Sequence, residues 1–152
     1  MNIEQFLIDD DEGIKKCLAG SKTIAVIGIK PESRSNQPAF YVPKFMQNAG
    51  YKILPVPVYY PEVTEILGEK IYRHLSEIEQ EIDIVNLFRK PLDVPKHIDE
   101  IISAKPKYVW MQLGIRNDDA ALKFAEAGIK VIQDRCLLVE YRAFFPEASV
   151  LR

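Results

Sequence analysis

Five short runs of β-branched and aliphatic residues recur along this chain, and each is separated from the next by a segment long enough to hold a helix. The runs are Thr23–Gly28, Tyr51–Val56, Ile82–Phe88, Tyr108–Leu113 and Ile129–Gln133. Nearly continuous apolar runs of this length are typical of parallel strands buried on both faces. Because parallel strands need crossover connections, the pattern predicts an α/β fold, a Rossmann-like, doubly wound, five-stranded parallel sheet.

The connecting segments carry helix signals of different strength. A short helix is predicted after Asp10 or Asp11, and others over Val94–Ala104, Asp118–Ala127 and Leu137–Phe144. Pro38 suits the first turn of a helix that Gly50 closes, but Pro43 favours a start nearer Tyr41 or a kink. The stretch 59–76 is the least regular and is expected to be a surface excursion.

Length, charge and cysteine content limit the function classes. The 152 residues predict a single domain over 1–152 with its core at about 22–144, and a formal charge of −2 predicts no nucleic-acid or membrane partner. No apolar run approaches the roughly 20 residues that a bilayer-spanning helix needs. Cys17 and Cys136 are far apart and lack metal-site spacing, so we expect a cytoplasmic protein without a metal.

The loop after the first run carries the strongest binding signal. Gly28 is followed by Lys30, Ser33 and Arg34, and this polar loop leads into the predicted helix at Pro38. Ligands of open parallel sheets lie beyond the carboxyl ends of the strands, and a helix N-terminus favours phosphate. The loop therefore predicts a phosphate site; the alternative is an ordinary strand-to-helix loop with solvated cations.

A nicotinamide dinucleotide fits the sequence poorly. Of the three glycines in a GxGxxG motif only Gly28 is present, and no carboxylate follows the second run before Glu62. Pro55 and Val56 form an apolar strand end in place of the acid that would hold a ribose. The pattern favours another adenine nucleotide, although a proline-bounded strand end is also a simple way to stop a strand.

The remaining strand ends add polar and thiol groups. Phe88 and Arg89 follow the third run, and Gln112 and Gly114 follow the fourth. Cys136 follows the fifth, near a predicted helix N-terminus, but neither histidine, His74 or His97, lies near it in the sequence as a base.

The combination resembles a known family. The residues that carry the resemblance are Ala25-Val26-Ile27-Gly28 with Arg34-Ser35, Pro55-Val56, Asp83-Ile84-Val85 with Phe88-Arg89, Trp110-Met111-Gln112-Leu113-Gly114 and Asp134-Arg135-Cys136. They resemble the small, single-domain CoA-binding proteins of the YccU-like family, which are similar to the CoA-binding domain of the succinyl-CoA synthetase α-subunit. The resemblance implies a Rossmann-like fold and coenzyme A (CoA) or acyl-CoA as ligand.

The resemblance also implies roles for particular residues. Around the nucleotide phosphates it places Gly28, Ile29, Lys30, Ser33 and Arg34. Beside the adenine it places Pro55 and Val56, and the pocket is completed by Phe88, Arg89, Gln112 and Gly114. Many relatives carry a small residue where this chain has Lys30, which can act there as a point charge.

Three hypotheses remain open at this point. The first is a binding protein for CoA or acyl-CoA that is not catalytic on its own. The second is an NAD-linked or CoA-dependent enzyme that uses Cys136. The third is an interaction module whose Rossmann-like core has lost its ligand, and no protein partner is identified for it.

Overall fold

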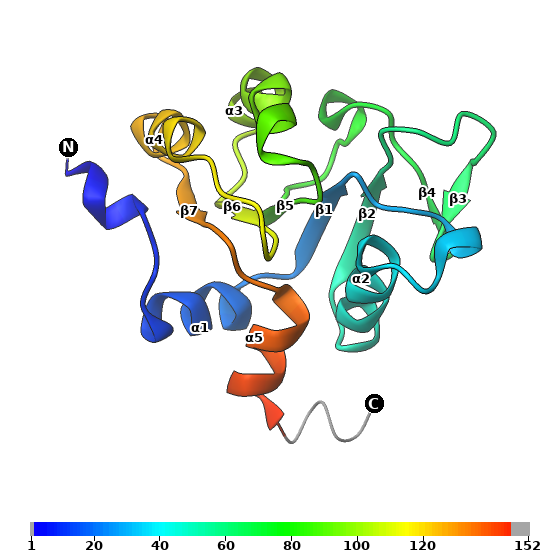
Figure 1. Ribbon diagram of the computed structural model, residues 1–152, viewed down its shortest axis with the longest axis horizontal. Coiled ribbons are helices and arrows are strands. Elements are labelled where there is room, and N and C mark those ends of the chain that lie inside the picture. Colours follow the sequence, from blue (N-terminus) through cyan, green and yellow to red (C-terminus); the bar gives the residue numbers. More distant parts are fainter. Residues whose placement is uncertain (1, 147–152) are drawn as a thin grey trace.

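The computed structural model describes residues 2–146, so residue 1 and residues 147–152 of the predicted domain lie outside the described residues. Its centre is a parallel sheet with the strand order β2-β1-β5-β6-β7 (Figure 1). The strands are β1 (Thr23–Ile27), β2 (Lys52–Val56), β5 (Ile84–Leu87), β6 (Tyr108–Met111) and β7 (Lys130–Ile132). The predicted five-stranded parallel sheet is confirmed.

Helices cover both faces of the sheet (Figure 1). On one face lie α1 (Asp11–Gly20), α2 (Pro38–Asn48) and α5 (Leu137–Phe144), and on the other lie α3 (Ile98–Ala104) and α4 (Asp118–Glu126). This doubly wound arrangement is Rossmann-like, as predicted. Within residues 2–146, no helix has the length and apolar character that crossing a bilayer demands.

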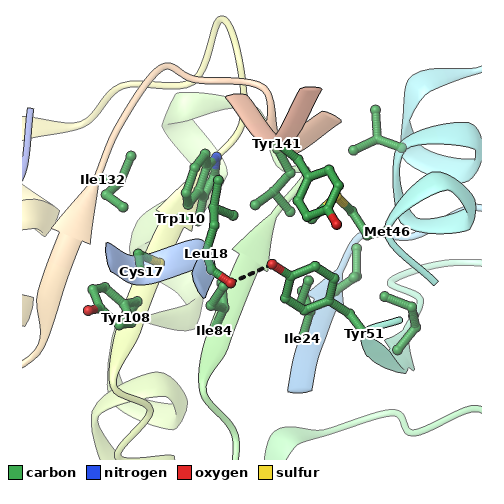
Figure 2. Close-up of a cluster of buried hydrophobic side chains, with 14 of the residues drawn as sticks. Cys17, Leu18, Ile24, Met46, Tyr51, Ile84, Tyr108, Trp110, Ile132 and Tyr141 are labelled. Atoms are coloured by element: carbon green, nitrogen blue, oxygen red, sulfur yellow. Dashed lines mark hydrogen bonds between the residues drawn. The ribbon is translucent and has the colours of Figure 1, made fainter. Parts of the chain in front are cut away.

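Alternate side chains of each strand belong to different cores. In β1, Ile24 and Val26 pack toward α1, α2 and α5, whereas Ala25 and Ile27 pack toward α3 and α4. Figure 2 shows the first of these cores, where Trp110 is buried and the Tyr51 hydroxyl donates a hydrogen bond to the Leu18 carbonyl. Burial on both faces explains why the strands appear in the sequence as continuous apolar runs.

The excursion between β2 and β5 holds structure that the sequence pattern did not predict. It contains a two-stranded antiparallel sheet of β3 (Glu65–Ile66) and β4 (Glu69–Lys70), followed by a 3₁₀ helix at Leu75–Glu77. The Arg73 guanidinium holds the preceding turn by donating to the carbonyls of Tyr59, Tyr60 and Val63. These hydrogen bonds join residues 10 to 14 positions apart, so the hydrophobic periodicity of the sequence does not predict them.

Prolines explain where two helices depart from expectation. The helix predicted over Val94–Ala104 is divided into a 3₁₀ helix at Pro91–His97 and α3, because Pro95 cannot donate a backbone hydrogen bond. By contrast, α2 begins at Pro38 and continues through Pro43. Since Pro43 has no N–H, the Ala39 carbonyl one turn earlier lacks its helical donor, and it accepts the N–H of Lys30 at 3.1 Å.

Gly28 lies where the order of the strands reverses, between the carboxyl ends of β2 and β5. Its N–H donates to the Val56 carbonyl at 2.9 Å, and Phe88 N–H donates to the Ile27 carbonyl at 2.9 Å. Gly28 has φ of +90°, and a Cβ at this position would collide with the Phe88 carbonyl oxygen. The chain can therefore turn out of β1 here only with glycine.

Asp83 holds together the opposite, amino-terminal edge of the sheet. Its carboxylate accepts the N–H of Lys22 at 2.7 Å and of Thr23 at 3.2 Å, and it lies 3.2 Å from the Lys107 ammonium. Burial raises the pKa of this carboxyl, but the two N–H donors and Lys107 outweigh burial and hold the pKa below its ordinary value. These contacts fix the start of β1 against the start of β5.

Gly28→Ala is expected to destabilise the protein more than Gly128→Ala does. Gly128 has a similar φ of +83° but open space where a Cβ would lie, so its substitution costs only backbone strain, about 1–2 kcal/mol. At Gly28 the collision with the Phe88 carbonyl adds a further penalty of about 1–3 kcal/mol. Urea unfolding of both variants measures the difference, and equal losses would show that the Gly28 backbone has room to adjust.

Asp83→Asn is expected to lower the free energy of unfolding at pH 7 by about 1.5–3 kcal/mol, because two N–H donors lose a charged acceptor. The folded-state pKa is below the ordinary 3.8, so the contribution is complete above pH 3.8 and is lost as pH falls through the folded pKa. Urea unfolding across acid pH should show the gap between variant and parent closing in that range. Asp99→Asn, at an exposed carboxylate, is the control; a gap that is independent of pH would contradict this account.

Candidate functional site

A cavity of about 640 Å³ opens at the carboxyl ends of the parallel strands, beside the point where the strand order reverses. Its walls come from the ends of β1, β5, β6 and β7 and from the first turns of α2 and α5. The lining residues are Gly28, Lys30, Gln37, Pro38, Ala39, Tyr41, Val42, Phe88, Arg89, Lys90, Pro91, Gln112, Leu113, Gly114, Ile115, Cys136, Leu138 and Val139. This is the position at which open α/β sheets bind ligands.

The N-terminus of α2 opens onto the cavity. Gln37 occupies the N-cap position but makes no side-chain cap hydrogen bond; its Oε1 instead accepts from the Lys30 ammonium. The Lys30 backbone is held by its hydrogen bond to the Ala39 carbonyl. An uncapped helix N-terminus next to a fixed lysine is suited to an anion.

Arg89 reaches the cavity from the end of β5 and is held by two neighbours. Its Nε donates to His97 Nε2 at 3.1 Å, and its Nη2 lies 3.9 Å from the Asp93 carboxylate. Burial, together with the charge of Arg89, lowers the pKa of His97, so His97 stays a neutral acceptor at neutral pH. The guanidinium is therefore oriented in advance, with Nη1 left without a partner among the described residues.

The electrostatic character of the cavity is one-sided. Lys30, Arg89 and Lys90 line it, and no Asp or Glu does so among residues 2–146. Since the chain as a whole carries a formal charge of −2, this concentration of positive charge is local. Such a site attracts a group with several negative charges.

The other end of the cavity is less charged and holds a buried amide and a thiol. Gln112 is only 4% exposed, and Cys136 lies at the N-cap position of α5. Gly114 has φ of +86°, and its N–H donates to the Asp134 carboxylate at 2.7 Å, which fixes the loop after β6. Large apolar side chains complete the walls and rim: Tyr41, Phe88, Leu113, Leu138 and Val139.

The structure brings together six of the eleven residues predicted as ligand contacts. Gly28, Lys30, Phe88, Arg89, Gln112 and Gly114 all line the cavity. Ile29 is buried in the core, Ser33 and Arg34 are exposed on a 3₁₀ helix at Glu32–Arg34, and Pro55 and Val56 are buried in β2. None of these last five lines the cavity, and their contacts with a ligand stay predictions.

Several lining residues were not singled out by the sequence pattern. They are Gln37 and Tyr41 of the α2 start, Leu113 after β6, and Leu138 and Val139 in the first turn of α5. Leu113 is 65% exposed and Val139 54%, and both stand at the rim of the cavity. Their position in the sequence could have indicated them, because the first turn of each helix that follows a parallel strand lies at the edge of the sheet where ligands bind.

Comparison with known proteins identifies the family of this chain. The family model described as "CoA binding domain" matches residues 22–142. The uncharacterized protein YneT of Bacillus subtilis (strain 168) is 38% identical over 128 residues, which cover 84% of this chain and 91% of YneT.

Solved structures agree in both fold and length. The Thermus thermophilus protein called cell-free ID.343 is 35% identical with a TM-score of 0.82, over 90% of this chain and 100% of that one. A hypothetical protein from Pyrococcus horikoshii OT3 is 32% identical with a TM-score of 0.80, over 90% of this chain and 92% of that one. A family match across most of the chain, a curated relative of nearly equal length and a shared fold lead to one conclusion: this chain belongs to the CoA binding domain family.

Proposed function

We propose that the protein binds CoA or an acyl-CoA in the cavity at the carboxyl ends of β1, β5, β6 and β7. The observation that carries the proposal is the charge of the lining: three cations and, among the described residues, no carboxylate, in a chain of the CoA binding domain family. CoA carries a diphosphate and a 3′-phosphate, which need such a concentration of donors. Lys30, Arg89, Lys90 and the N-terminus of α2 are the groups that would contact these phosphates.

The rest of the ligand has suitable surroundings on either side of the cations. The apolar rim of Tyr41, Leu113 and Val139 suits the pantetheine arm or an acyl chain. On the other side, Ser33 and Arg34 can contact a phosphate only if the ligand extends over the 3₁₀ helix at Glu32–Arg34, as the family resemblance implies. The same extension would bring the adenine toward the end of β2, near Pro55 and Val56.

We favour binding over catalysis by this chain on its own. Of the described residues 2–146, one cysteine, Cys136, lines the cavity. No histidine, aspartate or glutamate of these residues lines it. Histidine, aspartate and glutamate are the side chains that act most often as general acids and bases. Two free cysteines suit a reducing compartment, so we place this binding in the cytoplasm.

Arg89→Ala is expected to weaken CoA binding by about ten-fold or more, since a charged hydrogen bond is worth about 1.5–3 kcal/mol. Isothermal titration with CoA measures the affinity, with NAD as the comparison ligand. Lys16→Ala is a matched control, because it removes one positive charge from an exposed position on α1 without touching the cavity. CoA should bind to the parent and to this control alike, and NAD should not bind.

Arg34→Ala tests how far the ligand extends. A loss of affinity comparable to that of Arg89→Ala means that the phosphates reach the 3₁₀ helix at Glu32–Arg34. An unchanged affinity removes Arg34 from the site while leaving the cavity residues in place. If parent and Lys16→Ala show no affinity for CoA at all, the proposed function is wrong.

A further inference from the structure

Cys136 occupies a fixed place at the end of the cavity that is away from the cations. The segment before it is held by two hydrogen bonds: Arg135 N–H donates to the Met111 carbonyl at 3.3 Å, and Trp110 Nε1 donates to the Arg135 carbonyl at 2.7 Å. Cys136 is the N-cap residue of α5 and is partly exposed, in contrast to Cys17, which is 0% exposed. The backbone that carries Cys136 is therefore fixed against the end of β6.

A buried amide beside Cys136 has donors to spare. Gln112 Oε1 accepts from the Leu137 N–H and from Asn86 Nδ2, each at 3.4 Å. Its Nε2 has no hydrogen-bond partner among the described residues, and Gln112 lines the cavity although the residue as a whole is only 4% exposed. This amide group is therefore free to donate a hydrogen bond to a ligand in the cavity. The acceptor expected here is a carbonyl oxygen.

The positions of charge and thiol give the bound molecule a direction. The cations come from the ends of β1 and β5, whereas Gln112 and Cys136 come from the ends of β6 and β7. The chain after β7 runs back over the end of β6, where Arg135 N–H donates to the Met111 carbonyl, so Gln112 and Cys136 lie about two strand spacings, roughly 10 Å, from the end of β1. A ligand with phosphates at one end, amide carbonyls in the middle and a sulfur at the other end matches the order of the cations, the Gln112 amide and the Cys136 thiol along the cavity.

Resting on the CoA binding proposed above, we propose that Cys136 and Gln112 form a subsite for the sulfur end of CoA, in which Cys136 undergoes thiol–disulfide exchange with CoA disulfide. The Cys136 thiol gives its proton to water and its sulfur attacks one sulfur of the CoA disulfide. A Cys136–CoA disulfide forms, the original S–S bond breaks, and the second CoA leaves as a thiolate that takes up a proton. One disulfide is consumed and one is made, so no other oxidant is required.

The leaving half of the disulfide has room. A second hollow of about 320 Å³ lies on the far side of Cys136 and shares Leu113, Cys136 and Val139 with the first cavity. The thiol therefore stands where the two hollows meet. Gln112 acts as a positioning residue that donates to a carbonyl of the arm held in the first cavity.

The test is intact-protein mass spectrometry after incubation with CoA disulfide or, separately, with oxidised glutathione at the same concentration. The parent should gain a single CoA that a reducing agent removes. The CoA adduct should form at least about ten-fold faster than the glutathione adduct, because binding presents the sulfur to Cys136. Cys17→Ser should react as the parent does, and Cys136→Ser should not react. Peptide mapping of the parent adduct identifies the modified cysteine independently of how that variant folds.

Titration with reduced CoA separates this inference from the proposed function. The parent and Lys16→Ala, whose substitution lies on α1 outside the cavity, should bind reduced CoA within about two-fold of each other. If the parent binds CoA but reacts with both disulfides at the same rate, or reacts at Cys17, the sulfur subsite is wrong and CoA binding stands. If the parent does not bind reduced CoA, the proposed function itself fails.

Discussion

The site depends on one close approach of backbone to backbone, where the chain leaves β1 at Gly28. This residue donates to the Val56 carbonyl on one side and lies against the Phe88 carbonyl on the other. Those contacts bring the end of β1 against the ends of both neighbouring strands, so the loops that follow β1 and β5 leave the sheet side by side. Lys30 and Arg89 converge on one cavity for this reason, although they are far apart in sequence.

The proline inside α2 also stabilises the site. Pro43 removes a helical donor, and the Ala39 carbonyl that it leaves open takes the N–H of Lys30. The first turn of the helix is thus hydrogen-bonded to the loop that precedes it. Because Gln37 accepts from the Lys30 side chain as well, both ends of this lysine are tied to the start of α2. The cation and the N–H groups of the helix consequently face the cavity together.

The strands and their parallel arrangement could be predicted because burial on both faces leaves a local signature, continuous β-branched runs such as Thr23–Ile27. The ends of those runs also indicated six cavity residues. Gln37 and Tyr41 escaped prediction because their role depends on how the first turn of α2 is rotated, which neighbouring residues do not reveal. Pro55 and Val56 show the reverse limit, since this strand end was predicted beside the ligand but is buried in β2 and does not line the cavity.

The positive charge of the cavity depends on the positions of nearby carboxylates as well as on those of the lysines and the arginine. Asp134 follows β7 at the same edge of the sheet, but its carboxylate accepts the Gly114 N–H. Glu32, in the loop after β1, turns outward to accept the Leu67 N–H, and Asp93 pairs with Lys96 at 3.0 Å. Each of these three carboxylates is thus held by a hydrogen bond or an ion pair and none of them lines the cavity, although Asp93 also lies 3.9 Å from Arg89 and helps to orient it. Local backbone and side-chain contacts thus build an anion site into a chain with a negative net charge.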